Sequence, residues 1–188
     1  PILVQTERDI EAGSPRDRDR EAVPDTLDAL MVRDADTALQ FGSKMQLSYN
    51  VENTQRAIGT RLSSHIVRKF GMTGLRENHI SVRLRGTAGQ SLGAFATQGL
   101  RLEVIGDAND YVGKGLSGGT IIVRPSPSAA FVAHENTIIG NTVLYGATSG
   151  KLFAAGQAGE RLCVRNSGAT AVVEGAGTNA CEYMTGGR

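Results

Sequence analysis

The chain has 188 residues and a formal net charge of +1. This length allows one domain with an appendage, and no global electrostatic field favours nucleic acid or a membrane as a partner. Glycine contributes 24 residues, aromatic residues 5% and tryptophan none, so the core must come mainly from Ile, Val, Leu and Ala. No hydrophobic run could cross a membrane, no signal-peptide pattern is present, and the two cysteines lack a CxxC spacing. The composition therefore predicts a turn-rich, mainly β protein of the reducing cytoplasm.

Charge is distributed unevenly along the chain. Residues 1–40 carry ten acidic and five basic side chains, whereas residues 56–85 carry seven basic side chains and one acidic side chain. The basic stretch has two interpretations: a face for an anionic partner, or a solvated helix face or contact with an acidic neighbouring domain. We favour the second, because charge runs of this kind usually mark a solvated face.

The first part of the chain is expected to precede the main body. Residues 1–43 are predicted to form a charged, partly flexible segment, and residues 44–79 a lead-in. The elements expected in the charged segment are a solvated linker and two short helices, at residues 13–24, 25–31 and 34–42. Strict alternation over residues 44–51 predicts a half-buried strand. A helix from Asn53 to Gly71 should follow, since its apolar residues recur with the helical period.

The remaining part, residues 80–188, consists of short strand-like runs separated by small residues. The runs are residues 80–84, 100–105, 120–123, 137–139, 142–145, 151–155, 161–164 and 171–173. No gap has room for a helix that would connect parallel strands, and no Asn-Gly or Asp-Gly hairpin signal occurs.

A spaced pattern of small residues recurs among these runs. Gly86-xx-Gly89-xxx-Gly93 returns as Gly156-xx-Gly159-xxx-Cys163 and as Gly168-xx-Ala171-xxx-Gly175. Repeated strand and turn units without helices indicate a β-solenoid, in which small residues at the corners let successive coils stack closely. A β-sandwich is the main alternative.

Residues 99–125 place a glycine-rich loop between two strand-like runs. Within it, Gly113, Gly115 and Gly118 spell G-x-G-x-x-G, the pattern of dinucleotide-binding loops. Such a loop needs a helix after it, whose N-terminus holds the phosphate groups, but here Thr120 begins a β-branched run. We therefore interpret these glycines as residues that let the chain turn sharply.

No group of residues predicts a catalytic, cofactor-binding or metal-binding site. Asp107, Asn109 and Asp110 resemble the start of a calcium loop, but no Glu stands at the twelfth position, so we expect them to bond nearby backbone amides in a turn. Cys163 and Cys181 have no metal-ligand spacing with the histidines. The residues predicted to serve turns and the stacking of coils are Gly86, Gly89, Gly93, Gly106, Asp107, Asn109, Asp110, Gly113, Gly115, Gly118, Gly119, Gly156, Gly159, Gly168 and Gly175.

Several long stretches resemble the C-terminal domain of the glutamate synthase large subunit, known for its GXGXG motif. They are SLGAFATQGLRLEVIGDANDYVGKGLSGGTIIVRP (residues 91–125), IIGNTVLYGATSG (residues 138–150) and GERLCVRNSGATAVVEGAGTNACEYMTGG (residues 159–187). The segment from Asn53 to Gly71 is similar to the helix that precedes that domain. The resemblance covers residues 44–188, and residues 1–43 match less distinctly.

The resemblance implies a right-handed parallel β-helix that continues beyond Arg188, within an enzyme that makes two L-glutamate from L-glutamine and 2-oxoglutarate. NAD(P)H or ferredoxin supplies the reducing equivalents. The partners implied are an amidotransferase domain and an FMN-binding synthase domain of the same polypeptide, and a small subunit. The FMN and an iron–sulfur cluster belong to the synthase domain, and the amidotransferase domain begins with a cysteine nucleophile. Neither site matches this sequence, which begins with Pro1 and has only two cysteines. A non-catalytic structural domain without a cofactor is therefore expected.

Two alternatives remain open at this stage. A related domain occurs as one of the subunits of formylmethanofuran dehydrogenase and in stand-alone archaeal proteins. The chain could thus be an assembly subunit that docks to separate chains, or a binding module that uses residues 106–119 for an anion or a nucleotide. The helical lead-in and the ending at residues 180–187 favour glutamate synthase.

Overall fold

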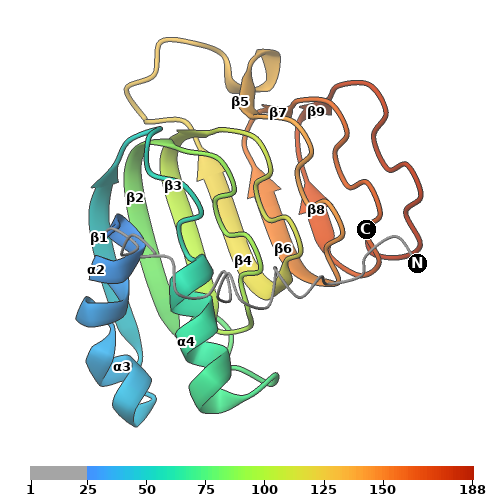
Figure 1. Cartoon of the computed structure of the whole chain (residues 1–188). Helices are drawn as coiled ribbons and strands as arrows, with labels where there is room; N and C mark the ends of the chain where they lie inside the picture. Colours follow the sequence, from blue (N-terminus) through green and yellow to red (C-terminus); the bar gives the residue numbers. More distant parts are fainter. Residues whose placement is uncertain (1–24) are drawn as a thin grey trace, which may run out of the picture.

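Parallel β-strands dominate the structure, a computed structural model that describes residues 25–188 (Figure 1). The strands are β1 (Met45–Val51), β2 (Ile80–Ala88), β3 (Leu100–Ala108), β4 (Ser117–Arg124), β5 (Thr137–Ile139), β6 (Ser149–Ala154), β7 (Gln157–Ala158), β8 (Thr170–Val172) and β9 (Gly175–Ala176). The helices are α2 (Leu27–Asp34), α3 (Asp36–Phe41), α4 (Thr60–Phe70) and the short 3-10 helix η2 (Ala133–Glu135). The predicted mainly β class is confirmed, and the linker predicted at residues 13–24 lies outside the described residues.

The strands form one sheet in which every strand pair is parallel. β1 pairs with β2, and β2 with β3. From β3 the sheet continues through β4, β6 and β8 on one path and through β5, β7 and β9 on the other. Figure 1 shows β1, β2, β3, β4, β6 and β8 side by side in a curled layer, with β5, β7 and β9 in a second short row and the connections returning along one side. We call the chain from the start of one strand of the row β1, β2, β3, β4, β6 and β8 to the start of the next strand in that row a unit, so that β5, β7 and β9 lie within the units that begin with β4, β6 and β8.

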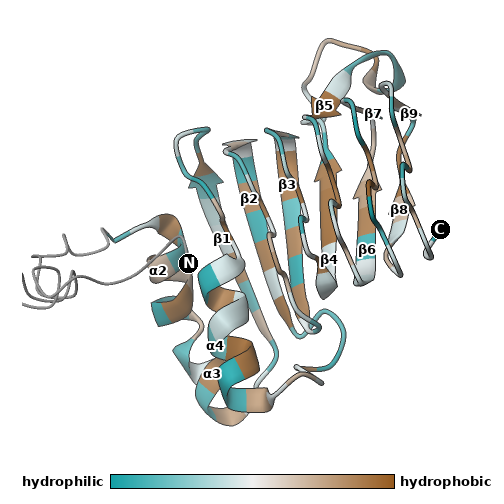
Figure 2. Ribbon diagram, turned by 45° about the vertical axis from the view of Figure 1, so that its right-hand side comes forward, coloured by the Kyte–Doolittle hydropathy of each residue, from teal (hydrophilic) through white to brown (hydrophobic). Residues whose placement is uncertain are grey.

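The core lies on the side of the sheet that faces these connections. Leu102, Ile121 and Leu152 pair in register on β3, β4 and β6, and none of the three is exposed. Their neighbours along each strand point to the opposite side, since side chains alternate across a strand. Figure 2 shows this alternation as apolar and polar bands along β2 and β3. Burial of each such side chain contributes about 2 kcal/mol to folding.

Most predicted strands appear, but two are wrong. Residues 142–145 and 161–164 form turns, although their β-branched and apolar residues suggested strands. Thr142, Leu144, Arg161 and Cys163 have positive φ values, which no strand of L-residues adopts. The apolar side chains in these segments are buried because the segments pack against the sheet, so burial here does not indicate extended backbone.

Helix α4 begins at Thr60, seven residues later than predicted from Asn53. The residues before it bond to the next unit instead of starting a helix. The N–H of Ala57 donates to Gln90 O, and the carbonyl of Ile58 accepts from Gly93 N. Gly59 has a φ of 92° and stands at the N-cap, where a Cβ would lie 2.7 Å from Leu102 Cδ1. This glycine therefore packs closely against β3, at a position just before the helix rather than within it.

The N-terminus of α4 is capped by a side chain from a different helix. Asp28 of α2 is only 4% exposed, and its carboxylate accepts from Gly59 N at 3.1 Å and from Arg61 N at 2.6 Å. Unpaired N–H groups and the helix dipole make this end of a helix favourable for a carboxylate. Asp28 thereby joins α2 to α4, a contact that sequence inspection did not suggest.

We expect Asp28→Ala to lower the free energy of unfolding by about 2 kcal/mol, because two N–H groups would lose their acceptor. Asp28→Asn should cost less, since its amide oxygen can still accept one of the bonds.

Burial raises the pKa of Asp28, so the folded state holds a proton at this carboxyl more tightly than the unfolded chain does. The stability of the wild type relative to Asp28→Asn should therefore be greatest in acid and fall as the pH rises through the raised pKa. Urea denaturation at a series of pH values measures both effects, and a pH-independent difference would contradict the second.

Candidate functional site

The connections between strands carry a regular run of unusual backbone angles. In five successive units, three alternating residues have φ values between 54° and 65°. These triplets are Ser91, Gly93 and Phe95; Tyr111, Gly113 and Gly115; Thr142, Leu144 and Gly146; Arg161, Cys163 and Arg165; and Asn179, Cys181 and Tyr183. Most of these residues are not glycine, and each non-glycine residue costs about 1 kcal/mol in this conformation. A regular set of bonds must offset that cost.

The triplets use their amides to hold neighbouring units together. The middle residue donates to the preceding unit: Gly113 N bonds Leu92 O, and Leu144 N bonds Val112 O, each at 2.8 Å. The outer residues donate to the following unit, as Tyr111 N does to Asn141 O at 2.8 Å. In the first four triplets the amides thus bond each unit both to the one before it and to the one after it.

This arrangement accounts for the glycine-rich loop at residues 106–119. The N–H of Gly115 donates to Tyr145 O at 2.8 Å, and that of Gly119 to Ala96 O at 3.1 Å. Strand β4 follows the loop directly, starting at Ser117. The backbone donors that a phosphate cradle would need are therefore already bonded to other units at Gly113, Gly115 and Gly119.

The glycines singled out from the sequence lie where units approach one another closely. At each of them, a Cβ would come within 3.0 Å of an atom of another unit. They are Gly86, Gly89, Gly93, Gly106, Gly113, Gly115, Gly118, Gly119, Gly156, Gly159, Gly168 and Gly175. Gly86 and Gly106 pair in register on β2 and β3, with φ values of 125° and 147°. A side chain at Gly106 would point at the carbonyl oxygen of Gly86.

Asp110 was expected to accept a hydrogen bond from a nearby backbone amide in a turn, but its side chain bonds to the next unit instead. Asp110 Oδ1 accepts from Asn141 N at 2.8 Å, and Asn141 Oδ1 accepts from Glu160 N, also at 2.8 Å. The two side chains form a ladder along one corner of three successive units. Asp107 and Asn109 lie beside it, Asp107 at the end of β3 and Asn109 with its N–H bonded to Ala88 O.

Most charged side chains of the strands lie on the side of the sheet opposite the core. We call the middle of that side the outer face. It comprises outward residues from the middle of β2, β3, β4 and β6, namely Ser81, Arg83, Arg85, Arg101, Glu103, Ile105, Thr120, Ile122, Arg124, Lys151 and Phe153. Five of these side chains are basic and one is acidic. The middle of this side therefore carries a net positive charge, although Glu77 pairs with Lys151 and the whole chain is nearly neutral.

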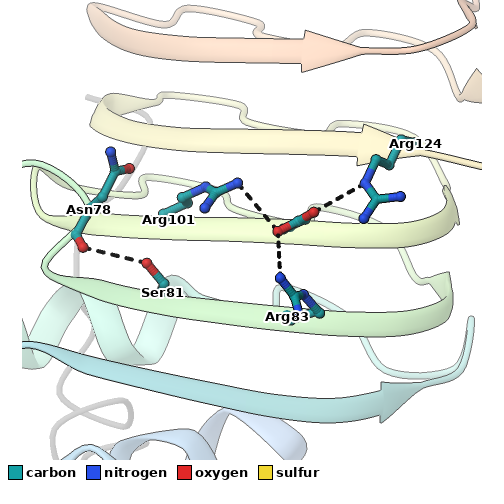
Figure 3. Close-up of polar contacts among 6 residues, drawn as sticks. Asn78, Ser81, Arg83, Arg101 and Arg124 are labelled. Atoms are coloured by element: carbon teal, nitrogen blue, oxygen red, sulfur yellow. Dashed lines mark hydrogen bonds and ion pairs between the residues drawn. The ribbon is translucent and has the colours of Figure 1, made fainter.

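Three arginines from three adjacent strands converge on one carboxylate (Figure 3). Glu103 of β3 lies 3.1 Å from Arg124 Nε, 3.3 Å from Arg101 Nη2 and 3.7 Å from Arg83 Nη2. Glu103 is only 8% exposed, whereas the three guanidinium side chains remain partly exposed. We call these four residues the arginine cluster. Beside it is a cavity of about 270 Å³, lined by Arg83, Arg101 and Glu103 and by residues of β1.

The basic stretch at residues 56–85 does not form one surface. Arg61, Arg68 and Lys69 lie on α4, whose preceding Gly59 packs against the inward side chain of Leu102. Arg83 lies on the outer face, on the other side of the sheet. Sequence inspection missed the arginine cluster because two of its arginines follow this stretch in the chain, and only strand pairing brings them beside Arg83.

Two polar or reactive side chains are buried farther along the stack. Asn166 is fully buried; its Oδ1 accepts from Ala169 N at 2.9 Å, and its Nδ2 donates to Ala169 O at 2.9 Å.

Cys163 and Cys181 stand at equivalent triplet positions of consecutive units, and the first is buried while the second is exposed. Burial, together with the neighbouring Cys181, raises the pKa of the Cys163 thiol to about 12. Burial and a raised pKa both disfavour the thiolate, the form in which a cysteine acts as a nucleophile.

The described residues contain neither a cluster of metal ligands nor a helix suited to a membrane. Within residues 25–188, no three His, Cys, Asp or Glu side chains are grouped to hold a metal ion. In the same part of the chain, no helix has the length and apolar character needed to cross a membrane.

Comparison with known proteins places the chain in a family. Residues 28–188 match the family described as the GXGXG motif. The chain is 73% identical over 168 residues to the large chain of NADPH glutamate synthase from Azospirillum brasilense, a match that covers 89% of the chain and 11% of the relative. It is 51% identical over 160 residues to ferredoxin-dependent glutamate synthase 2 from Synechocystis sp., covering 85% of the chain and 10% of the relative. It is also 50% identical over 161 residues to NADH glutamate synthase from Saccharomyces cerevisiae, covering 85% of the chain and 8% of the relative.

The chain thus spans about a tenth of the length of the curated relatives that it matches. The family match covers both the sheet and the triplets that bond its units together. The chain therefore belongs to the GXGXG motif family and is closely similar to one segment of glutamate synthase large chains.

Proposed function

We propose that the chain is a non-catalytic scaffold domain of a glutamate synthase and that it folds as a right-handed parallel β-helix. Residues 80–188 form the β-helix in this proposal, residues 44–79 its lead-in and residues 1–43 a charged N-terminal segment. The observation that carries the proposal is that the amides of Gly113 and Gly115 bond to neighbouring units. Donors that already join adjacent units serve stacking rather than the binding of a phosphate.

The high identity to glutamate synthases supports the proposed parent enzyme, which makes two L-glutamate from L-glutamine and 2-oxoglutarate. Relatives named for NADPH, ferredoxin and NADH are 73%, 51% and 50% identical to the chain. Because the same segment occurs with all three electron donors, we infer that the choice of donor depends on other parts of the polypeptide. We place the FMN and the iron–sulfur cluster in those parts as well. The amidotransferase and synthase domains are then the partners of this domain, in the cytoplasm.

The scaffold proposal is tested with the purified chain beside a full-length large chain. Once circular dichroism shows β structure, the chain alone should lack flavin absorbance, glutaminase activity and glutamate formation, whereas the full-length protein shows all three. Flavin that co-purifies with the chain in equimolar amount would contradict the proposal, and so would glutamine hydrolysis by the chain.

The anion-binding alternative is tested separately by calorimetric titration of the chain with ATP, NADPH and 2-oxoglutarate. We expect no binding heat from any of them, because the amides of Gly113, Gly115 and Gly119 are already bonded to other units. Saturable binding that is lost on substitution within residues 106–119 would instead support the hypothesis that the chain is an anion-binding or nucleotide-binding module.

A further inference from the structure

The outer face combines fixed positive charge with unused hydrogen-bonding capacity. A guanidinium group has five N–H donors, and Arg101 and Arg124 each direct one nitrogen to Glu103. Both oxygens of Glu103 are engaged by these bonds. The cluster carries three positive charges and one negative charge, so an excess of two remains on a partly exposed surface. Further carboxylates could bind there without displacing Glu103.

Glu103 also holds the arginines in place. Its carboxylate is buried on the middle strand, while Arg83 and Arg124 reach it from β2 and β4. Flexible arginine side chains lose rotamer entropy when they bind a partner, and a pre-existing contact reduces that loss. The cluster is thus pre-organised to recognise an anion, and guanidinium geometry suits carboxylates in particular.

An apolar row continues from the cluster across the same face. Glu103 is in register with Ile122, which is in register with Phe153 and then with Val172. Phe153 is 37% exposed and Val172 is 53% exposed. The outer face therefore offers a cavity with two arginines on the β1 side of Glu103 and an apolar strip on its other side, a combination typical of a protein interface that has aromatic and arginine anchors.

We propose that the outer face docks a carboxylate-bearing segment of the parent polypeptide, one that lies outside these 188 residues. Its Asp or Glu side chains bind in the cavity beside Arg83 and Arg101, and an apolar side chain farther along the same segment packs on Phe153, three strands away from Arg83. Charge complementarity identifies the chemistry of the partner, and the relatives, of which this chain covers 8–11%, show that ample chain exists to supply it. This inference rests on the proposed scaffold function, because it names the surface through which the scaffold contacts its neighbour.

The test uses Arg83→Lys and Arg101→Lys in the full-length large chain. A carbodiimide joins a lysine amine to a carboxylate only when the two are in contact, and mass spectrometry identifies the joined peptides. We expect position 83 or 101 to couple to an Asp or Glu outside the 188 residues, and this product to be lost when the protein is unfolded in urea before coupling. Two lysines away from the outer face serve as internal controls: Lys69, which is exposed on α4, and Lys114, which is partly exposed in the connections.

The outcomes separate the two proposals. If positions 83 and 101 couple only to carboxylates within the 188 residues, or to none, the docking proposal is wrong. If Lys69 or Lys114 then couples to another part of the polypeptide, the scaffold function stands while this surface is excluded. If no lysine of the domain couples outside it, both proposals lose their support.

Discussion

Gly106→Ala should lower the free energy of unfolding by about 4 kcal/mol, the largest effect that we expect from a single methyl group. Two causes add at this position. The φ value of Gly106 is 147°, in a region open essentially to glycine alone, and the new Cβ would point at the carbonyl oxygen of Gly86 in the adjacent strand. That oxygen belongs to the backbone, so no side-chain rotation can relieve the contact. Urea denaturation followed by circular dichroism measures the loss.

Gly146→Ala is the matched control for this substitution. Gly146 also has a positive φ, 62°, but no atom lies within 4 Å of the position that its Cβ would take. Its substitution should cost only the backbone strain, about 1 kcal/mol. If both variants lose the same stability, close stacking of the units does not explain the glycine at position 106.

Glu103→Gln should cost about 2 kcal/mol, because it leaves three clustered guanidinium groups without their negative partner. A fully buried pair would cost more, but partial exposure of the arginines to solvent reduces the repulsion among them. Added salt should restore part of the loss, since ions screen like charges near a surface. Thermal unfolding at low and high ionic strength measures both the loss and its recovery.

Glu77→Gln provides the comparison for a solvated ion pair. Glu77 lies 2.6 Å from Lys151 Nζ, but both side chains are about half exposed. Such a pair contributes about 0.5 kcal/mol or less. We therefore expect Glu77→Gln to be nearly neutral, and a loss equal to that of Glu103→Gln would contradict the special role of the arginine cluster.

Only part of the candidate site could be predicted from the sequence. The glycines of residues 106–119 were recognisable as turn residues, because a β-branched run follows them where a phosphate loop would need a helix. Glu103 was not recognisable, since a single acidic residue in an alternating strand looks like any solvated position. Asp28 was missed for a related reason: the helix that it caps begins 32 residues later, and most caps that can be read from a sequence are local.

The triplets show where local patterns mislead. Segments such as residues 142–145 contain β-branched and apolar residues, and propensity alone predicts strands there. Their backbone is turned instead, because hydrogen bonds to the units before and after them stabilise positive φ values. Those bonds join residues roughly one unit apart, so no short window of sequence contains them.

The sequence by itself determined the mainly β class, the positions of most strands and the family, because alternation and glycine spacing are local and the resemblance is long. Only the tertiary structure decided which side chains meet. Parallel pairing brings Arg83, Glu103 and Arg124 together from three strands. The stacking of units makes the amides of Gly113 and Gly115, which belong to the G-x-G-x-x-G pattern, hydrogen-bond donors to neighbouring units. The physical reason is that strand register and unit stacking set these distances, and both depend on contacts between residues that are far apart in the chain.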